Sequence, residues 1–275
     1  EVCKNLDTKF IILHKESAFT PLEEKNAPLI YKKFNNRSLS HKISVYSESQ
    51  KKILIQSRIG TKSQIKVNGN PRCDYAFRLR NIIPKKKIIV FYLIETYRNT
   101  NYLVNDKKKN WNKLLNQTLK YLIELAKNNP NINVVLKGKT GIHEKYYLKL
   151  KNLPKNCTFI YGGSGEKLLR DASVVIAFNS TIVFETIASN RNLIIPNFNN
   201  ESVTKKNILH KIENKIYFAN SKKQFNKKIN FYLNTKYKNK KLSNDDIKTL
   251  KYYVGNTDGT SGIKIQKFLN KILYK

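Results

Sequence analysis

Hydrophobic and polar residues alternate in blocks along most of the chain after residue 86. Apolar runs of strand length, rich in β-branched residues, lie at 87–94, 133–136, 158–161, 174–178, 193–196 and 215–218. Segments with helical spacing separate them, at 108–127, 144–150, 165–170, 181–189, 203–212 and 222–233. Strands that are apolar on both faces and joined by single helices indicate a parallel sheet covered on both sides. We therefore predict a doubly wound α/β domain.

The first 80 residues repeat this pattern weakly. Strands are predicted at 9–14, 42–46 and 65–67, with a helix at 49–59. These are too few strands for a complete doubly wound sheet, and the chain begins at Glu1 without a methionine, so we interpret residues 1–82 as the end of a truncated first α/β domain. Pro84 and the lysines after it mark a linker to a second domain at 83–254.

The last segment, residues 255–275, opens with the turn signal "GNTDGTSG". Apolar residues then follow the i, i+3, i+4, i+7 spacing of one helix face, at Ile265, Phe268, Leu269 and Ile272. We expect a packed helix here, with Ser261 as its N-cap.

Charge changes this picture little. The net charge is +34, but 45 of the 53 basic residues are lysine, and they are spread over nearly every polar segment. Abundant Lys, Asn and Ile are typical of AT-rich codon usage, whereas nucleic-acid readers cluster Arg and Lys with aromatic residues. No specific nucleic acid is expected as a partner. If the charge is functional, an anionic membrane surface or a phosphate-bearing substrate suits it better.

Cysteine and histidine usage argues against two classes of site. The three cysteines are far apart and form no CxxC pair, which argues against a disulfide framework and a zinc ribbon and fits a reducing cytosol. The four histidines are isolated, so no metal site is expected. No apolar run approaches the ~18 residues of a membrane span. We expect a cytoplasmic protein, with peripheral contact at the inner face of the membrane as an option.

The stretch 172–198 carries the strongest candidate chemistry. The strand at 174–178 ends at Asn179, Ser180 and Thr181, where a helix begins, and helix N-termini favour phosphate. Glu185 lies four residues after Thr181, with Ser189 four further on. A carboxylate at this position can accept hydrogen bonds from the two vicinal hydroxyls of a ribose. The alternative is that this stripe is the solvated face of an ordinary amphipathic helix.

Two further strand ends could contact a ligand. Gly163 lies in a glycine-rich turn after the strand at 158–161, where the backbone could approach a ligand closely. Lys137 and Lys139 follow the strand at 133–136 and could neutralise a diphosphate. Ordinary surface or turn roles stay open for all of these residues.

The first domain offers three candidates. Arg72, in "VNGNPRCD", is one of only eight arginines, which suggests a need for bidentate geometry. It could pair with Asp74 or reach a phosphate, and Gly69 and Pro71 before it predict a turn. His14 and Glu16 follow the first strand and are candidates for a general base, the alternative being ordinary loop residues.

These stretches together resemble bacterial GT-B glycosyltransferases of surface polysaccharides. The segments "KISVYSESQKKILIQSRIG" and "QIKVNGNPRCD" are similar to the end of the N-terminal domain of that family, and 159–198 to its nucleotide-binding half. "GNTDGTSGIKI" resembles a C-terminal element of the family. Capsule and lipopolysaccharide proteins are the nearest relatives that we can name, and CDP-glycerol glycerophosphotransferases are more distant. The resemblance covers about residues 10–270.

The resemblance implies two Rossmann-like domains with a nucleotide-activated donor between them. By resemblance, Ser180 and Thr181 would hold the diphosphate, Glu185 the ribose, Gly163 would border the nucleotide and Arg72 would lie near the hinge. The CDP-glycerol branch has His-Pro after the strand lysine where this chain has Gly138-Lys139, which argues against polyol-phosphate transfer.

The hypothesis is a metal-independent glycosyltransferase for a surface-polysaccharide or lipid-linked acceptor. Its only cofactor-like ligand is the nucleotide sugar, which is the donor substrate. The alternatives are a sugar-nucleotide epimerase on the same fold and a non-enzymatic binder of polyanions or membrane surfaces.

Overall fold

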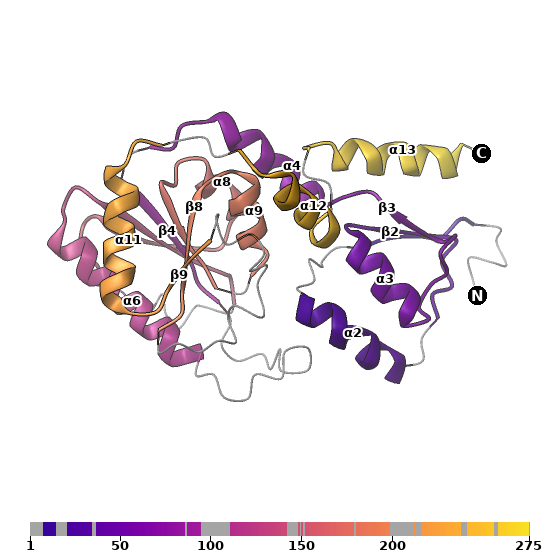
Figure 1. Ribbon diagram of the computed structural model, residues 1–275, viewed down its shortest axis with the longest axis horizontal. Helices are drawn as coiled ribbons and strands as arrows, with labels where there is room; N and C mark the ends of the chain where they lie inside the picture. Colours follow the sequence, from indigo (N-terminus) through magenta and orange to yellow (C-terminus); the bar gives the residue numbers. More distant parts are fainter. Residues whose placement is uncertain are drawn as a thin grey trace.

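The chain forms two parallel sheets flanked by helices (Figure 1). The computed structural model describes residues 8–14, 21–34, 37–85, 87–94, 111–141, 148, 150, 152–178, 180–198, 212, 216–237, 241–255 and 258–274. All strand pairs in both sheets are parallel. The predicted α/β class is therefore confirmed.

The smaller sheet has the order β1-β2-β3 and is built from the first part of the chain. Its strands and the helices between them are β1 (Ile11–Leu13), α2 (Pro21–Lys33), β2 (Lys42–Val45), α3 (Glu48–Gln56) and β3 (Ile65–Val67). Buried Ile43, Val45 and Ile65 face Leu54 of α3 and form its small core. The first domain thus has three described strands, as its sparse pattern predicted.

The helix α4 (Pro71–Arg78) follows β3, and the sequence pattern missed it, as it missed α2. Its N-cap is Asn70, whose side chain accepts a hydrogen bond from the Arg72 N–H, and Pro71 occupies the first turn. Proline suits that position because its missing N–H would have no helical partner there. The predicted turn is confined to Gly69, which has a φ of 93°. A short 3₁₀ turn, η1 (Leu79–Asn81), then leads to the second sheet.

The larger sheet has six strands in the order β6-β5-β4-β7-β8-β9. Its strands are β4 (Ile88–Tyr92), β5 (Asn133–Gly138), β6 (Cys157–Tyr161), β7 (Val174–Ile176), β8 (Asn192–Pro196) and β9 (Ile216–Ala219). The described helices around it are α6 (Trp111–Asn128), α8 (Glu166–Leu169), α9 (Ile182–Ala188) and α11 (Lys222–Asn234). The helices predicted at 144–150 and 203–212 fall almost entirely outside the described residues.

Each face of this sheet is covered by its own core. Ile89 and Phe91 of β4 join the cluster under α6 and α11, and Val90 and Tyr92 join the cluster under α4, α8 and α9. Because successive side chains of a strand point to opposite faces, a sheet that is covered twice needs continuous apolar strands. This is the physical basis of the pattern from which the domain was predicted.

The end of the chain returns to the first sheet (Figure 1). The helix α12 (Asn244–Tyr253) packs against α3, and α13 (Ser261–Leu273) packs against α4. The Lys9 Nζ donates to the Ile272 carbonyl at 2.6 Å. The stripe of α13 that the sequence predicted, with Phe268 and Leu269 at its centre, is only half-buried.

The predicted N-cap of α13 is wrong. Ser261 is the first helical residue and Thr260 is the N-cap, without a side-chain capping bond. The Asp74 carboxylate on α4 takes that role, because it accepts hydrogen bonds from the Ser261 N–H at 3.0 Å and the Gly262 N–H at 2.7 Å. A cap from so distant a residue has no local sequence signal.

No described helix combines the length and the apolar character that crossing a membrane requires.

Candidate functional site

The strand order of the larger sheet contains a topological switch point between β4 and β7. From β4 the chain first builds β5 and β6 on one side, then crosses back to place β7, β8 and β9 on the other. The connections that leave β4 and β7 at their carboxyl ends therefore diverge. Open α/β sheets bind their ligands in the crevice at this point.

Glu185 lies on α9, the helix that follows β7 at the switch point. Its side chain is only 2% exposed, and Ser189 on the same stripe is fully buried. Burial is so complete because α9 packs against both α4 and β8. The interpretation of this stripe as a solvated helix face is therefore wrong for Glu185 and Ser189, and holds only for the exposed Thr181.

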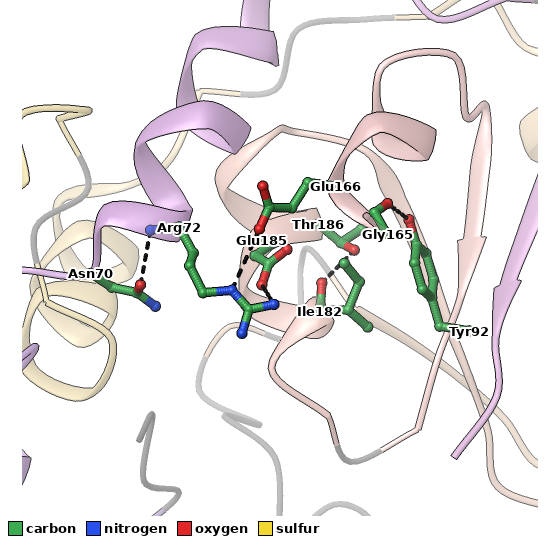
Figure 2. Close-up of polar contacts among 8 residues, drawn as sticks. All are labelled: Asn70, Arg72, Tyr92, Gly165, Glu166, Ile182, Glu185 and Thr186. Carbon is green, nitrogen blue, oxygen red and sulfur yellow. Dashed lines mark hydrogen bonds and ion pairs between the residues drawn. The ribbon is translucent and has the colours of Figure 1, made fainter. Parts of the chain in front are cut away.

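The partner of Glu185 comes from α4, which lies far earlier in the chain (Figure 2). The Arg72 guanidinium lies between two carboxylates, with its Nη2 3.5 Å from the Glu185 Oε1 and its Nε 3.4 Å from the Glu166 Oε1. The predicted pair of Arg72 with Asp74 is not formed, since Asp74 caps α13 instead. We call Arg72, Glu166 and Glu185 the arginine–carboxylate cluster.

The Glu185 carboxyl is poorly solvated within this cluster. Its Oε2 is buried and has no hydrogen-bond partner among the described residues. Burial raises the pKa of Glu185 from its ordinary value near 4.5 to about 7, against the opposing charge of Arg72 and with the support of Glu166. A buried acceptor without a donor is costly, and in native proteins it often marks a place where a ligand or water binds.

The turn after β6 borders the cluster. Gly162 and Gly163 both have positive φ, at 77° and 69°. A Cβ on Gly162 would lie 2.7 Å from the Thr140 Oγ1, whereas a Cβ on Gly163 would meet nothing within 4 Å. The Tyr92 hydroxyl, at the end of β4, donates to the Gly165 carbonyl at 2.6 Å and holds this turn against the switch point (Figure 2). Gly163 is thus the open, exposed member of the turn.

Lys137 is at the expected edge of the sheet, but its ammonium group is already engaged. It donates to the Gly138 carbonyl at 2.8 Å and to the Gly162 carbonyl at 2.5 Å, and the residue is buried. Burial lowers the pKa of this lysine, and the neighbouring Lys139 lowers it further. Lys137 therefore ties β5 to the glycine turn, which favours the structural interpretation over a diphosphate contact.

The three residues between β7 and α9 are described in part. Ser180 is half-buried and Thr181 is exposed, and Thr181, the N-cap, makes no side-chain capping bond. The first bonds of the helix run from Val183 N–H to the Ser180 carbonyl and from Phe184 N–H to the Thr181 carbonyl. Asn179 lies outside the described residues.

The candidates for a general base lie on the smaller sheet. His14 follows β1, and its backbone N–H donates to the Ser44 carbonyl. The Nδ1 of its imidazole lies 2.7 Å from the Gln50 Nε2. Gln50 in turn accepts from the Tyr46 N–H, so the imidazole is held at the carboxyl edge of the first sheet. Glu16 lies outside the described residues.

Two members of the site were missed from the sequence. Glu166 follows the glycine turn as the first residue of α8, and this carboxylate beside the glycines was the available signal. Tyr92 looked like one more apolar strand residue, and only its position at the switch point reveals its role.

Other parts of the described chain offer weaker sites. No group of three or more His, Cys, Asp or Glu side chains among the described residues could hold a metal ion. A surface pocket of about 430 Å³ lies at the opposite edge of the larger sheet, lined by Lys87, Asn128, Asn129, Pro130, Asn131, Ile132, Asn230, Leu233 and Asn234. That edge holds the amino ends of β4 and β5, where ligands of open α/β sheets do not bind, so we place the site at the arginine–carboxylate cluster.

Comparisons with known proteins bear on the fold. No protein-family model and no curated protein matches the chain. Among solved structures it is similar to the UDP-GlcNAc 2-epimerase of Methanocaldococcus jannaschii in complex with UDP-GlcNAc and UDP. The TM-score is 0.51 at 14% identity, over 98% of this chain and 78% of that one.

Two further structures agree with this one. The wall teichoic acid polymerase TagF matches with a TM-score of 0.52 at 13% identity, over 85% of this chain. The matched part is 58% of the TagF chain, so this protein spans little more than half of that polymerase. A Listeria monocytogenes protein assigned as a UDP-N-acetylglucosamine 2-epimerase matches with a TM-score of 0.52 at 12% identity, over 99% of this chain and 71% of that one. The shared feature is the GT-B type fold with Rossmann-like domains, as the sequence predicted.

Proposed function

We propose that this chain binds a nucleotide-activated sugar at the switch point and transfers the sugar to a surface-polysaccharide or lipid-linked acceptor. The single observation that carries the proposal is the Glu185 carboxylate. It is buried beside the switch point of a GT-B type fold, and its Oε2 has no partner among the described residues. Two vicinal ribose hydroxyls are donors of the kind that this oxygen requires.

Residues near Glu185 would bind the other parts of the donor. In the proposal, Ser180 and Thr181 contact the diphosphate, and Gly163 allows the nucleotide to approach the backbone. The nucleotide sugars in the fold neighbours support this class of ligand, since one of those structures is a complex with UDP-GlcNAc and UDP. Lys137 supports the glycine turn in this proposal and makes no contact with the ligand.

The reaction proposed is the displacement of a nucleoside diphosphate from the anomeric carbon. An acceptor hydroxyl forms the new C–O bond, the bond from the anomeric carbon to the phosphate oxygen breaks, and the hydroxyl proton passes to a base. His14 and Glu16 are the candidates for this base on the first domain. Positioning and electrostatic stabilisation of the leaving diphosphate would be the main catalytic contributions. No metal ion takes part in this scheme, so a chelator should leave the rate unchanged.

Epimerisation of the nucleotide sugar is the second candidate. The observation in its favour is that two of the structures above, which cover 98% and 99% of this chain, are a 2-epimerase and a protein assigned as one. The two candidates share the nucleotide site and differ in the product. Incubation with UDP-GlcNAc separates them, because transfer releases UDP only when an acceptor is added, whereas epimerisation yields the 2-epimer with no acceptor.

The binding site itself is tested by comparing ribose with deoxyribose. We expect UDP, CDP or GDP to raise the thermal unfolding temperature, and the effective nucleotide to bind about tenfold or more tightly than its 2′-deoxy form, as for a hydrogen bond to a charged group. Glu185→Gln should reduce that preference.

A chain that none of these nucleotides stabilises would contradict the proposal. Salt-sensitive binding to polyanions that Glu185→Gln does not alter would then favour a basic surface binder. Peripheral contact with an anionic membrane stays a prediction, to be tested with vesicles of phosphatidylglycerol against phosphatidylcholine.

A further inference from the structure

Arg72 is the residue whose position the proposed binding site does not by itself explain. We propose that Arg72 is a positioning residue, which holds Glu185 in the ionised form and in the orientation that the ribose hydroxyls require. The inference rests on the proposed function of Glu185. It adds that nucleotide recognition is controlled by a side chain from α4, the helix before the larger sheet, one that need not touch the nucleotide.

The geometry of α4 aims Arg72 at the site. Asn70 caps the helix and Pro71 sets its first turn, so Arg72 leaves the chain at a well-defined point. Helix α4 is itself anchored in the second domain, because Cys73 and Ala76 belong to the core under α9. Packing therefore fixes where Arg72 leaves the chain, and its guanidinium points to Glu185 and Glu166 (Figure 2).

The arrangement leaves one carboxylate oxygen for the ligand. Arg72 contacts the Oε1 of Glu185, whereas Oε2 has no partner among the described residues. The same guanidinium contacts Glu166 through its Nε, so it spans two carboxylates from two helices. Arginine suits this task because its donors lie in a fixed plane, whereas the lysine ammonium is a single point of charge on a flexible stem.

Arg72 is also what favours the charged form of Glu185. The titratable groups around Glu185 are Arg72 and Cys73 from α4, Glu166 from α8 and Tyr92 from β4. Burial raises the pKa of Glu185 to about 7, Arg72 opposes this and Glu166 adds to it. Burial also raises the pKa values of the Cys73 thiol and the Tyr92 hydroxyl, so both stay neutral. Of these four groups, only Arg72 stabilises the carboxylate.

Ionisation matters because the two forms of the carboxyl group offer different hydrogen bonds. A carboxylate only accepts, and can take both ribose hydroxyls, whereas the protonated acid carries a donor of its own. Without Arg72 the acid should persist to higher pH, and the preference for ribose should be lost near neutrality.

The experiment measures the affinity ratio of UDP to 2′-deoxy-UDP by calorimetry between pH 6 and pH 9, with CDP and GDP and their deoxy forms in parallel. In the wild type we expect a ribose preference of about tenfold or more that declines as the pH falls and Glu185 takes up a proton. In Arg72→Met the midpoint of this decline should move to higher pH, so that the preference is small at pH 7.5 and returns towards pH 9. Arg72→Lys should lie between the two.

Two further variants complete the design. Glu166→Gln removes the charge that opposes ionisation, so it should move the midpoint to lower pH, and it keeps the inference testable if Arg72→Met does not fold. Arg170→Met is the matched control, because it removes an exposed arginine just after α8 and should behave as the wild type.

A wild type that prefers ribose, with an unchanged midpoint in Arg72→Met, would overturn the role of Arg72 and leave the proposed function standing. A midpoint that moves equally in Arg170→Met would overturn it too, since net charge would then be the cause. A wild type without a ribose preference at any pH would overturn both the proposed function and this inference.

Discussion

The two sheets of this protein are held in different ways. The six-stranded sheet is buried on both faces by clusters of apolar side chains from its own domain and α4. The three-stranded sheet has one small apolar core, and Leu13 on its edge strand is 49% exposed. This sheet and its helices bury little apolar surface, and polar contacts with the end of the chain contribute part of their stability.

Two carboxylates make these contacts. Glu24 on α2 accepts from the Tyr252 hydroxyl of α12 at 2.8 Å and from the Lys52 Nζ at 2.6 Å. Asp74 accepts from the first N–H groups of α13. Glu185 of the larger sheet is the contrasting case, since its Oε2 is buried without a partner among the described residues. Satisfied carboxylates thus support the first domain, whereas a poorly satisfied one at the proposed binding site costs the second domain stability.

The largest expected effect is a core truncation in the six-stranded sheet. Ile176→Ala in β7 removes a fully buried side chain from a densely packed core, and should lower the free energy of unfolding by about 4 kcal/mol. The matched change Ile12→Ala in β1 affects a half-buried side chain and should lower it by about 1 kcal/mol. Urea unfolding measures both. Equal losses would show that the two sheets are packed alike.

The next effect concerns Glu185 and has a pH signature. The folded-state pKa of this group is raised to about 7 from near 4.5, so between these values the unfolded chain loses its proton first and the folded state is destabilised. Relative to Glu185→Gln, the wild type should lose about 3 kcal/mol of stability between pH 4 and pH 8. Thermal or urea unfolding across that range checks it. A difference that does not vary with pH would mean that folding leaves the pKa of Glu185 unchanged.

The cap of α13 should have a smaller effect. Asp74→Ala leaves the N–H groups of Ser261 and Gly262 without their acceptor, and should cost about 2 kcal/mol. Hydrogen exchange of α13 amides should accelerate more than exchange in the six-stranded sheet. The control is Asp258→Ala, an exposed carboxylate that bonds to Thr260 and should leave α13 protection nearly unchanged. Similar acceleration in both variants would show that Asp74 does not anchor the helix.

The smallest effect is expected at Glu24. Burial raises the pKa of this carboxyl, but hydrogen bonds from Lys52, Tyr252 and Ser49 outweigh it and leave the pKa below the ordinary 4.5. The ionised Glu24 should add about 1 kcal/mol to the free energy of unfolding. This stabilisation should be fully present above pH 4.5 and should disappear as the pH falls through the lowered pKa of Glu24.

Glu24→Gln should therefore be less stable than the wild type at pH 7 and equal to it at low pH, as measured by urea unfolding. Glu48→Gln, an exposed change on the neighbouring helix α3, is the control. A loss at Glu24 that persists at low pH would point to packing, with charge playing no part.

The sequence predicted well the features that depend on neighbouring residues, and poorly those that depend on contacts between distant parts of the chain. The strands and most of the described helices of the six-stranded sheet lie close to their predicted positions, because each buries a local periodic pattern. Helices α2, α4 and α12 were missed. The apolar residues of α4 and α12 face a core assembled from other parts of the chain, and α2 buries Ala27 against Ile53 of α3. At the site, the sequence singled out Glu185 and Arg72 separately and did not pair them.

By itself, the sequence determined that the chain forms parallel α/β sheets and that a carboxylate lies one turn into the helix after a central strand. Only the tertiary structure decided what that carboxylate contacts, that Lys137 binds backbone carbonyls, and that Asp74 caps a helix far along the chain. The reason is physical. Periodicity states which face of an element is buried, but a partner such as Arg72, 94 residues away from Glu166, is chosen by how the elements pack.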